Sequence, residues 1–439
     1  MEIGAYLRVF REEPGPVPPA KVVRRLVAHR LRRRLRRAAR RRQLRRGPID
    51  LSEHRLLEET GRRDRDELLE HLRRRGSPRF FFEPAEMEAL VAALRVDRPG
   101  SVQAAIGAAD DVRAHVFDLL GSGRVELGGR IDWHRDLVTG HRWPLVPAFD
   151  VPREGAPAGT EIKRAWELSR CQHFVTLGRA YAFSRDESYA REFVQQLRSW
   201  IEENPPWIGV NWCTAMEVAI RAVNWIWAWH FFAEASAFGA EDRTLLLRSL
   251  VLHGEYLAEN LEYFGPFSGN HYLADLVGLL AVATWLPELR RAKGWRRVAR
   301  RRLEEEMAGQ VLDDGVHFEG ATSYHRLALE MFLFADLLCR RNGPSLSAAY
   351  RSRLEKMFEY VLHYTRPDGS APQIGDNDDG RLLILGTSPP SDHRYLLSIA
   401  AALFARPDFK AAAGEFHEDA LWLLGLEGRR AFAAVEPAG

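Results

Sequence analysis

From Trp166 onward the chain carries two kinds of helical pattern. Three segments are apolar on nearly every side: 212–233, 271–286 and 322–339. Four others have one apolar and one charged face: 188–203, 241–262, 290–310 and 347–364. A helix that is apolar all round is buried, whereas an amphipathic helix covers a core from outside. Because the two kinds alternate, the pattern predicts an inner and an outer layer of helices.

Short breaks rich in Gly, Pro, Asn and Asp separate these helices, and breaks of this length join antiparallel neighbours. Such alternation is typical of an all-α (α/α) toroid of antiparallel helix pairs, which we expect over residues 81–425. Almost no segment has the period of a β-strand. A short helical solenoid is the competing architecture, but no repeat of fixed length supports it.

The rest of the chain is expected to flank this toroid. Residues 1–80 are rich in Arg, Leu and Glu and should form a charged helical region, while 426–439 should form a C-terminal tail. Residues 81–165 are punctuated by Gly and Pro and show no long periodic run.

The net charge of +3 conceals an asymmetry. Residues 21–46 contain one Lys and thirteen Arg but no acidic residue, so the remainder of the chain is net acidic. Apolar residues recur in this segment at near-helical spacing, which predicts a basic amphipathic helix: Val22, Val23, Leu26, Val27, Leu31, Leu35 and Ala38. We expect this helix at the periphery of the toroid. It suits an anionic membrane surface or an acidic glycan, with a partnerless solvated helix as the alternative; we do not expect nucleic acid as a partner.

The first residues, MEIGAYLRVFREEPGPVPP, lack the apolar core of a secretory signal. The longest apolar stretches are interrupted by His, Asp or Glu, so we expect no transmembrane helix and a cytoplasmic location. Cys171, Cys213 and Cys339 are far apart and form no CxxC pair, which predicts buried thiols and neither disulfides nor a zinc site.

Two of the predicted inner helices begin with residues that can do chemistry. GPFSGNHYLADL places Asn270 and His271 in a first turn, and DDGVHFEGATSYHRLALE places Tyr324 in another. The free N–H groups and the dipole of a helix N-terminus attract anions and should lower the pKa of a tyrosine. Each residue also has a structural alternative: a helix cap for Asn270, a pair with Asp275 for His271, and packing for Tyr324.

Taken together, the chain resembles the heparinase II/III family of polysaccharide lyases from about Ile131 to Arg381. The resemblance rests on these stretches: DWHRDLVTGHRWP (132–144), KRAWELSRCQHFVTLGRAYAFSRDESYA (163–190), NPPWIGVNWCTAMEVAIRAVNW (204–225), SGNHYL (268–273), DDGVHFEGATSYHRLALE (313–330) and PQIGDNDDGR (372–381). It implies an alginate lyase-like toroid that needs no cofactor. It also implies Asn270, His271 and Tyr324 as catalytic residues, with a further His from a β-sandwich that follows the toroid.

The implied reaction is cleavage of a uronic-acid polysaccharide by β-elimination. Asn270 would donate to the uronate carboxylate and make the C5 proton easier to remove. Tyr324 would protonate the departing C4 oxygen, and would also be the base when both groups leave from one face. His271 would be the base for the opposite-face epimer or an extra partner of the carboxylate.

Other positions are weaker candidates. We expect substrate contacts from Trp207, Trp212, His173, His317, Arg326, Asp376, Asn377 and Arg381. Glu217 and Arg221 are spaced i,i+4 on an apolar helix and should form a buried ion pair that fixes its register. The run DNDDG lacks the spacing and terminal Glu of an EF-hand, so we expect no metal there and a loop at the rim of the site.

The chain ends at Gly439, about where the β-sandwich of the family would begin. We therefore expect weak activity from this chain alone, or dependence on a separate β-sandwich partner chain. A non-catalytic toroid that binds acidic glycans or serves as a scaffold is the alternative function. A toroid glycoside hydrolase is less favoured, because it would need two opposed carboxylates.

Overall fold

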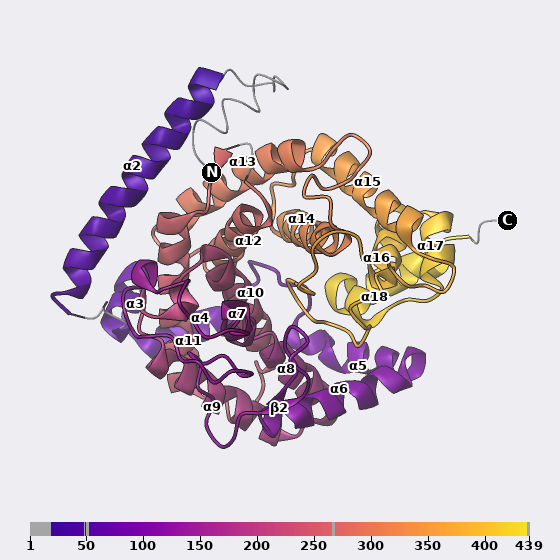
Figure 1. Cartoon of the computed structure of the whole chain (residues 1–439). Helices are drawn as coiled ribbons and strands as arrows, with labels where there is room; N and C mark the ends of the chain where they lie inside the picture. Colours follow the sequence, from indigo (N-terminus) through magenta and orange to yellow (C-terminus); the bar gives the residue numbers. More distant parts are fainter. Residues whose placement is uncertain (1–18, 48, 50–51, 266–267, 437–439) are drawn as a thin grey trace.

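The computed structural model describes residues 19–47, 49, 52–265 and 268–436, and most of them lie in helices arranged as two concentric rings (Figure 1). The inner ring contains α8 (His173–Ser184), α10 (Ala215–Phe231), α12 (Asn270–Trp285) and α14 (Thr322–Asn342). The outer ring contains α6 (Pro99–Arg113), α9 (Glu187–Glu203), α11 (Ala240–Asn260), α13 (Ala292–Gln310) and α15 (Ala348–Tyr364). The expected (α/α) toroid is confirmed, and residues 212–233 lie in its centre.

The ring is closed by helices from both ends of the chain: α16 (Arg394–Phe404), α17 (Pro407–Ala413), α18 (Glu418–Ala434) and α5 (Met87–Asp97). α15 packs on α16, α16 on α18, α18 on α5, and α5 on α6 and α8. Within the described residues, β-structure is limited to β1 (Val116–Phe117) paired antiparallel with β2 (Val125–Glu126). Short 3-10 turns complete the list: η1 (Pro84–Glu86), η2 (Ala148–Asp150) and η3 (Val210–Trp212).

Small residues let the inner helices approach closely. A Cβ on Gly278 of α12 would lie 2.5 Å from Cβ of Ala219 on α10, and a Cβ on Gly178 of α8 would lie 2.6 Å from Cβ of Phe231. Contacts this short leave no room for a larger side chain, so these two glycines set the spacing of the inner helices.

The flanking regions differ from the sequence expectation. Residues 81–165 contain α5 and α6, although Gly and Pro punctuate this stretch and no long periodic run predicted a helix. Pro99, one of those prolines, is the first residue of α6, where proline is tolerated. α3 (Glu53–Thr60) and α4 (Arg65–Arg74) pack on α11, and their residues Leu56 and Leu68 belong to the toroid's own core. The expected tail is helical as far as Ala434, with Phe432 buried.

The basic helix is present as α2 (Pro19–Leu44), which runs along the edge of the ring (Figure 1). It turns its apolar side outward: Val27, Leu31 and Leu35 are 48%, 56% and 63% exposed. Three of its arginines, Arg33, Arg37 and Arg40, are half-buried against the toroid, and Arg40 pairs with Glu259 (Nη2–Oε2 2.6 Å) at the end of α11. Residues 1–18 and the side chains of Val22, Val23 and Leu26 lie outside the described part.

No described helix combines the length and apolar composition that crossing a bilayer requires. The three cysteines are free and buried, as expected.

Candidate active site

Asn270 is the first residue of α12, and its amide already binds a carboxylate. Nδ2 of Asn270 donates to Oε2 of Glu319 at 2.8 Å. Glu319 lies so close to the start of the helix that a Cβ on Gly269 would collide with its Oε1. The first N–H groups of a helix and its dipole favour a negative charge at this end. The N-terminus of α12 is therefore a carboxylate site that the protein fills with its own side chain.

His271 follows Asn270 and is held by a different acid from the one considered in the sequence. Its Nδ1 pairs with Oε2 of Glu262 at 3.0 Å, while the backbone N–H of Glu262 donates to Oδ2 of Asp275 at 2.6 Å. The direct pair of His271 with Asp275 is wrong, because Asp275 is fully buried whereas 47% of the His271 side chain is exposed. Burial lowers the pKa of His271, but the hydrogen bond and charge of Glu262 outweigh it, so the pKa is raised.

Tyr324 lies in the first turn of α14 and keeps its proton at neutral pH. Its hydroxyl donates to Oδ2 of Asp378 at 3.4 Å. Burial raises the pKa of Tyr324 to about 12, and the charges of Asp378 and Asp376 add to the effect. The expected lowering by the helix dipole is wrong, because these nearby carboxylates outweigh it. At neutral pH the hydroxyl is thus a proton donor.

Glu319 lies between the N-terminal ends of α12 and α14. It accepts a hydrogen bond from Asn270 on α12, and its charge also acts on Tyr324 on α14. His271 is also close to a buried group of charged side chains that includes Arg170 and Glu217. Arg170, which follows α7 (Ile162–Ser169), donates from Nε to Oε2 of Glu217 at 2.6 Å, and both act on the pKa of His271. The structure therefore brings Asn270, His271 and Tyr324 to one face of the toroid.

Glu167 belongs to the same buried group and pairs with Arg170. Burial raises the pKa of Glu167 to about 7; the charges of Glu217 and Asp378 also raise it, against the opposing charge of Arg170. Since Asp378 is the acceptor for Tyr324, Glu167 lies within electrostatic reach of the tyrosine's partner. The charge of Glu167 therefore changes near neutral pH.

Several expected substrate contacts are buried with internal partners, and we correct them. Trp207 and Trp212 stack on each other with ring centroids 5.6 Å apart, and each is at most 1% exposed. Arg326 donates to backbone oxygens of Pro390 and Gly380, and Arg381 donates to Glu330 and Asp419.

The two candidate histidines are also held inside the fold. His173 contacts Oε1 of Gln196 at 2.9 Å, and burial lowers its pKa to about 4. His317 contacts Oε1 of Gln310 at 3.0 Å, and burial lowers its pKa to about 3. His317 nevertheless lies beside the site, because its Nδ1 is 3.6 Å from Oε2 of Glu319.

The expected ion pair between Glu217 and Arg221 does not form. Glu217 is bound by Arg170, whereas Arg221 donates from Nε to His253 at 2.9 Å and lies 4.2 Å from the ring centroid of Trp200. Both side chains still fix α10, but each through a different neighbour.

The DNDDG loop lies next to Tyr324, as expected, because Ser323 donates to the backbone oxygen of Asp376. Asp376 and Asn377 are exposed there and are free to meet a ligand. Among the described residues, no group of three or more His, Cys, Asp or Glu side chains is arranged to hold a metal.

Sequence reasoning missed Glu319 and Glu262 as parts of the site. Glu319 stands five residues before Tyr324 in a stretch that carried the resemblance, and that position was the available signal. Glu262 lies buried in the loop before α12, and nothing in the sequence distinguishes it from the other acidic residues of the chain.

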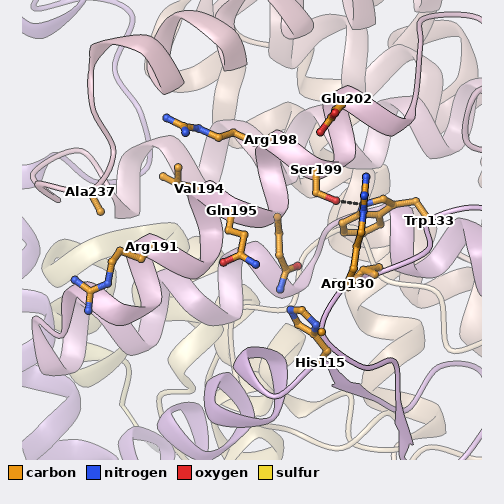
Figure 2. A pocket seen from close by; sticks show the side chains of 13 residues that line it. His115, Arg130, Trp133, Arg191, Val194, Gln195, Arg198, Ser199, Glu202 and Ala237 are labelled. Carbon is orange, nitrogen blue, oxygen red and sulfur yellow. Dashed lines mark hydrogen bonds between the residues drawn. The ribbon is translucent and has the colours of Figure 1, made fainter.

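A separate hollow of about 500 Å³ lies on the outer helix α9 (Figure 2). Figure 2 shows Arg130 and Trp133 on one side of it and Arg191 and Arg198 on the other, with Trp133 donating from Nε1 to Oγ of Ser199 at 3.0 Å. Arg130 is paired with Glu203, and Arg198 with Asp242. None of the three candidate catalytic residues lines it, so this hollow is distinct from the site above.

Curated relatives are similar to part of the chain. It is 27% identical over 220 residues to a heparin-sulfate lyase of Bacteroides thetaiotaomicron, covering 49% of this chain and 31% of that protein. It is 25% identical over 256 residues to a heparin-sulfate lyase of Pedobacter heparinus, covering 57% and 36%. The matched region thus spans about a third of the length of these relatives.

Solved structures show the same fold. The heparan sulfate lyase HepC from Pedobacter heparinus superposes with a TM-score of 0.54 at 22% identity, covering 81% of this chain and 51% of that chain. A heparinase III structure superposes with a TM-score of 0.55 at 21% identity, covering 82% and 53%. The family model described as the heparinase II/III N-terminus matches residues 59–384, well over half of the chain. The chain belongs to the heparinase II/III family.

Proposed function

We propose that this protein cleaves a uronic-acid polysaccharide by β-elimination, and that its substrate is of the heparin or heparan sulfate kind. The observation that carries the proposal is the contact between Asn270 and Glu319. This contact places a carboxylate on an amide donor at a helix N-terminus, and the charge of that carboxylate raises the pKa of the nearby Tyr324 hydroxyl. A uronate needs such a carboxylate site beside a proton donor if it is to undergo elimination.

In this proposal the substrate carboxylate replaces Glu319 on Asn270. The amide and the helix dipole then stabilise the negative charge that develops when the C5 proton leaves, which is the largest single term in many such reactions. Tyr324 gives its proton to the C4 oxygen of the leaving sugar, since its raised pKa keeps the hydroxyl protonated.

The base depends on which face of the sugar carries the C5 proton. His271 is suited to the opposite face, because Glu262 holds its Nδ1 and leaves Nε2 to point elsewhere. Its exposed surface makes it reachable by a ligand. For elimination from one face, the family resemblance implies that Tyr324 removes the C5 proton and then delivers it to the C4 oxygen, which requires the phenolate. The raised pKa of Tyr324 therefore favours the opposite-face reaction, with His271 as the base and Tyr324 as the acid.

The proposal extends to the partners of the toroid. A β-sandwich, in the same or a separate chain, supplies the further histidine that the family resemblance implies. The outward Val27, Leu31 and Leu35 of α2 suit contact with an anionic membrane surface, which co-sedimentation with anionic vesicles tests.

The decisive experiment is turnover of heparan sulfate, followed by the ultraviolet absorbance of the unsaturated uronate that only elimination produces. Reducing ends released without that absorbance would identify a hydrolase. Binding without turnover, with a heparinase-type β-sandwich added, would identify a glycan-binding toroid and would overturn the proposal.

A further inference from the structure

The inward face of α2 carries a row of basic side chains against the toroid. His29, Arg33, Arg37 and Arg40 follow one another at helical spacing and are half-buried. Arg36 donates from Nη1 to the backbone oxygens of Ala258 and Glu259, at 3.3 and 3.2 Å, and so satisfies carbonyls at the end of α11. These contacts fix the helix and the direction in which its arginines point.

Two arginines in the row have no partner among the described residues. Arg40 is paired with Glu259 and Arg41 with Asp150, but Arg33 and Arg37 have no ion pair, and their buried Nε atoms have no acceptor. The aromatic ring of Phe149 is 5.9 Å from the guanidinium carbon of Arg37 and supplies no counter-charge.

A third unpaired cation reaches the same place from the toroid. Arg153 is exposed, and within the described part of the chain its recorded contact is with the ring of Trp166, at 5.8 Å. Burial lowers the pKa of Arg37, and the positive charges of Arg33, Arg41 and Arg153 lower it further. Because these cations repel one another, a bound anion would stabilise them. The planar guanidinium group also fits two oxygens of a sulfate or carboxylate.

This basic cluster lies next to the proposed catalytic centre. The charge of Arg33 acts on Glu262, which holds His271, and on Asp275, which accepts from the backbone N–H of Glu262. The charges of Arg153 and Glu262 both act on Cys213, so Arg153 is near the same loop. An acidic polymer with one uronate on Asn270 would therefore bring a neighbouring acid group to these arginines.

We propose that Arg33, Arg37 and Arg153 form an anion subsite that binds a sulfate or carboxylate group of the polysaccharide, on a sugar next to the one that is cleaved. The inference rests on the proposed function for the identity of the polymer. It adds that substrate recognition includes α2, a helix outside the ring.

The test measures binding of a sulfated heparan-type hexasaccharide to the full chain by calorimetry, in a Tyr324→Phe background that prevents turnover. The variant Arg33→Gln/Arg37→Gln/Arg153→Gln should weaken binding about tenfold or more. It should also flatten the salt dependence, because fewer ions are released on binding. Arg153→Gln alone should weaken binding severalfold, and this exposed side chain can be replaced without risk to the fold.

A matched control removes the same charge from exposed positions of α2 and of the turn that follows it. Arg34, Arg42 and Arg45 are exposed, and the variant with Gln at all three should bind within about twofold of the parent. Equal losses in the two triple variants would show an unspecific charge effect and would overturn the subsite, as would no loss in either. A loss confined to duplex DNA binding would also overturn it, because the ligand would then be nucleic acid.

The same hexasaccharide without its sulfates identifies the group that is bound. A loss seen only with the sulfated probe assigns the subsite to sulfate, and an equal loss with both assigns it to carboxylate. Because binding is read without turnover, a protein with the native Tyr324 that binds the probe but never cleaves it would defeat the proposed lyase activity and leave the subsite in place.

Discussion

Replacing Glu319 with Gln tests the contact on which the proposed reaction depends. In the free protein the carboxylate of Glu319 accepts from Asn270 at 2.8 Å, and the substrate has to displace it. A hydrogen bond to a charged group contributes about 1.5–3 kcal/mol. The Glu319 side chain is 23% exposed, so the lower end applies. Gln keeps the shape of the side chain but makes a weaker, neutral hydrogen bond to Asn270. If that bond is weaker by about 1.4 kcal/mol, a uronate displaces the side chain more easily and binds about tenfold more tightly.

The assay is calorimetric titration of the Tyr324→Phe protein with a uronic-acid oligosaccharide at constant ionic strength. Asp314→Asn is the control, because Asp314 is an exposed acid of the same segment and its replacement changes the charge equally. We expect tighter binding for Glu319→Gln and an unchanged constant for Asp314→Asn. If the two variants bind alike, Glu319 does not occupy the carboxylate site and the reasoning from Asn270 fails.

Three further predictions concern the site and the fold. Tyr324→Phe in an active assembly should lower the rate by about two to four orders of magnitude and leave substrate binding intact, because only the acid proton is lost; a wild-type rate would remove Tyr324 from the mechanism. Glu167 has its pKa raised by burial to about 7, so its contribution to the free energy of unfolding is full at low pH and falls as pH rises from 4.5 to about 7. Glu167→Gln should remove this decline, on the order of 3 kcal/mol, from urea unfolding measured across that range, and an unchanged pH profile would contradict the raised pKa. Gly278→Ala should destabilise by about 1–3 kcal/mol, because its Cβ would lie 2.6 Å from Cα of Ala219, whereas Gly294→Ala on α13, which meets no atom within 4 Å, should be neutral or stabilising in thermal unfolding.

The layers of the toroid follow from the sequence alone. Segments 212–233, 271–286 and 322–339 are apolar on every side and must be buried, and the amphipathic segments that alternate with them cover them from outside. The first-turn positions of Asn270, His271 and Tyr324 were equally readable, because each follows a Gly-containing break. α5 and α6 were not readable, because their small Ala residues give weak periodicity and a proline such as Pro99 occurs both in first helical turns and in loops.

The protonation states and partners at the site were decided by the tertiary structure. Glu319 contacts Asn270 from 49 residues away, and Glu217 pairs with Arg170, just after α7, although Arg221 is four residues along the helix of Glu217. A pKa depends on burial and on charges that lie close in space. The pKa of Tyr324 is therefore raised, although its position at a helix N-terminus suggested a lowered pKa. The sequence determined the helices and the residue types at their ends. The tertiary structure decided which charged side chains lie close to one another, because the distances between separate helices are not encoded in local periodicity.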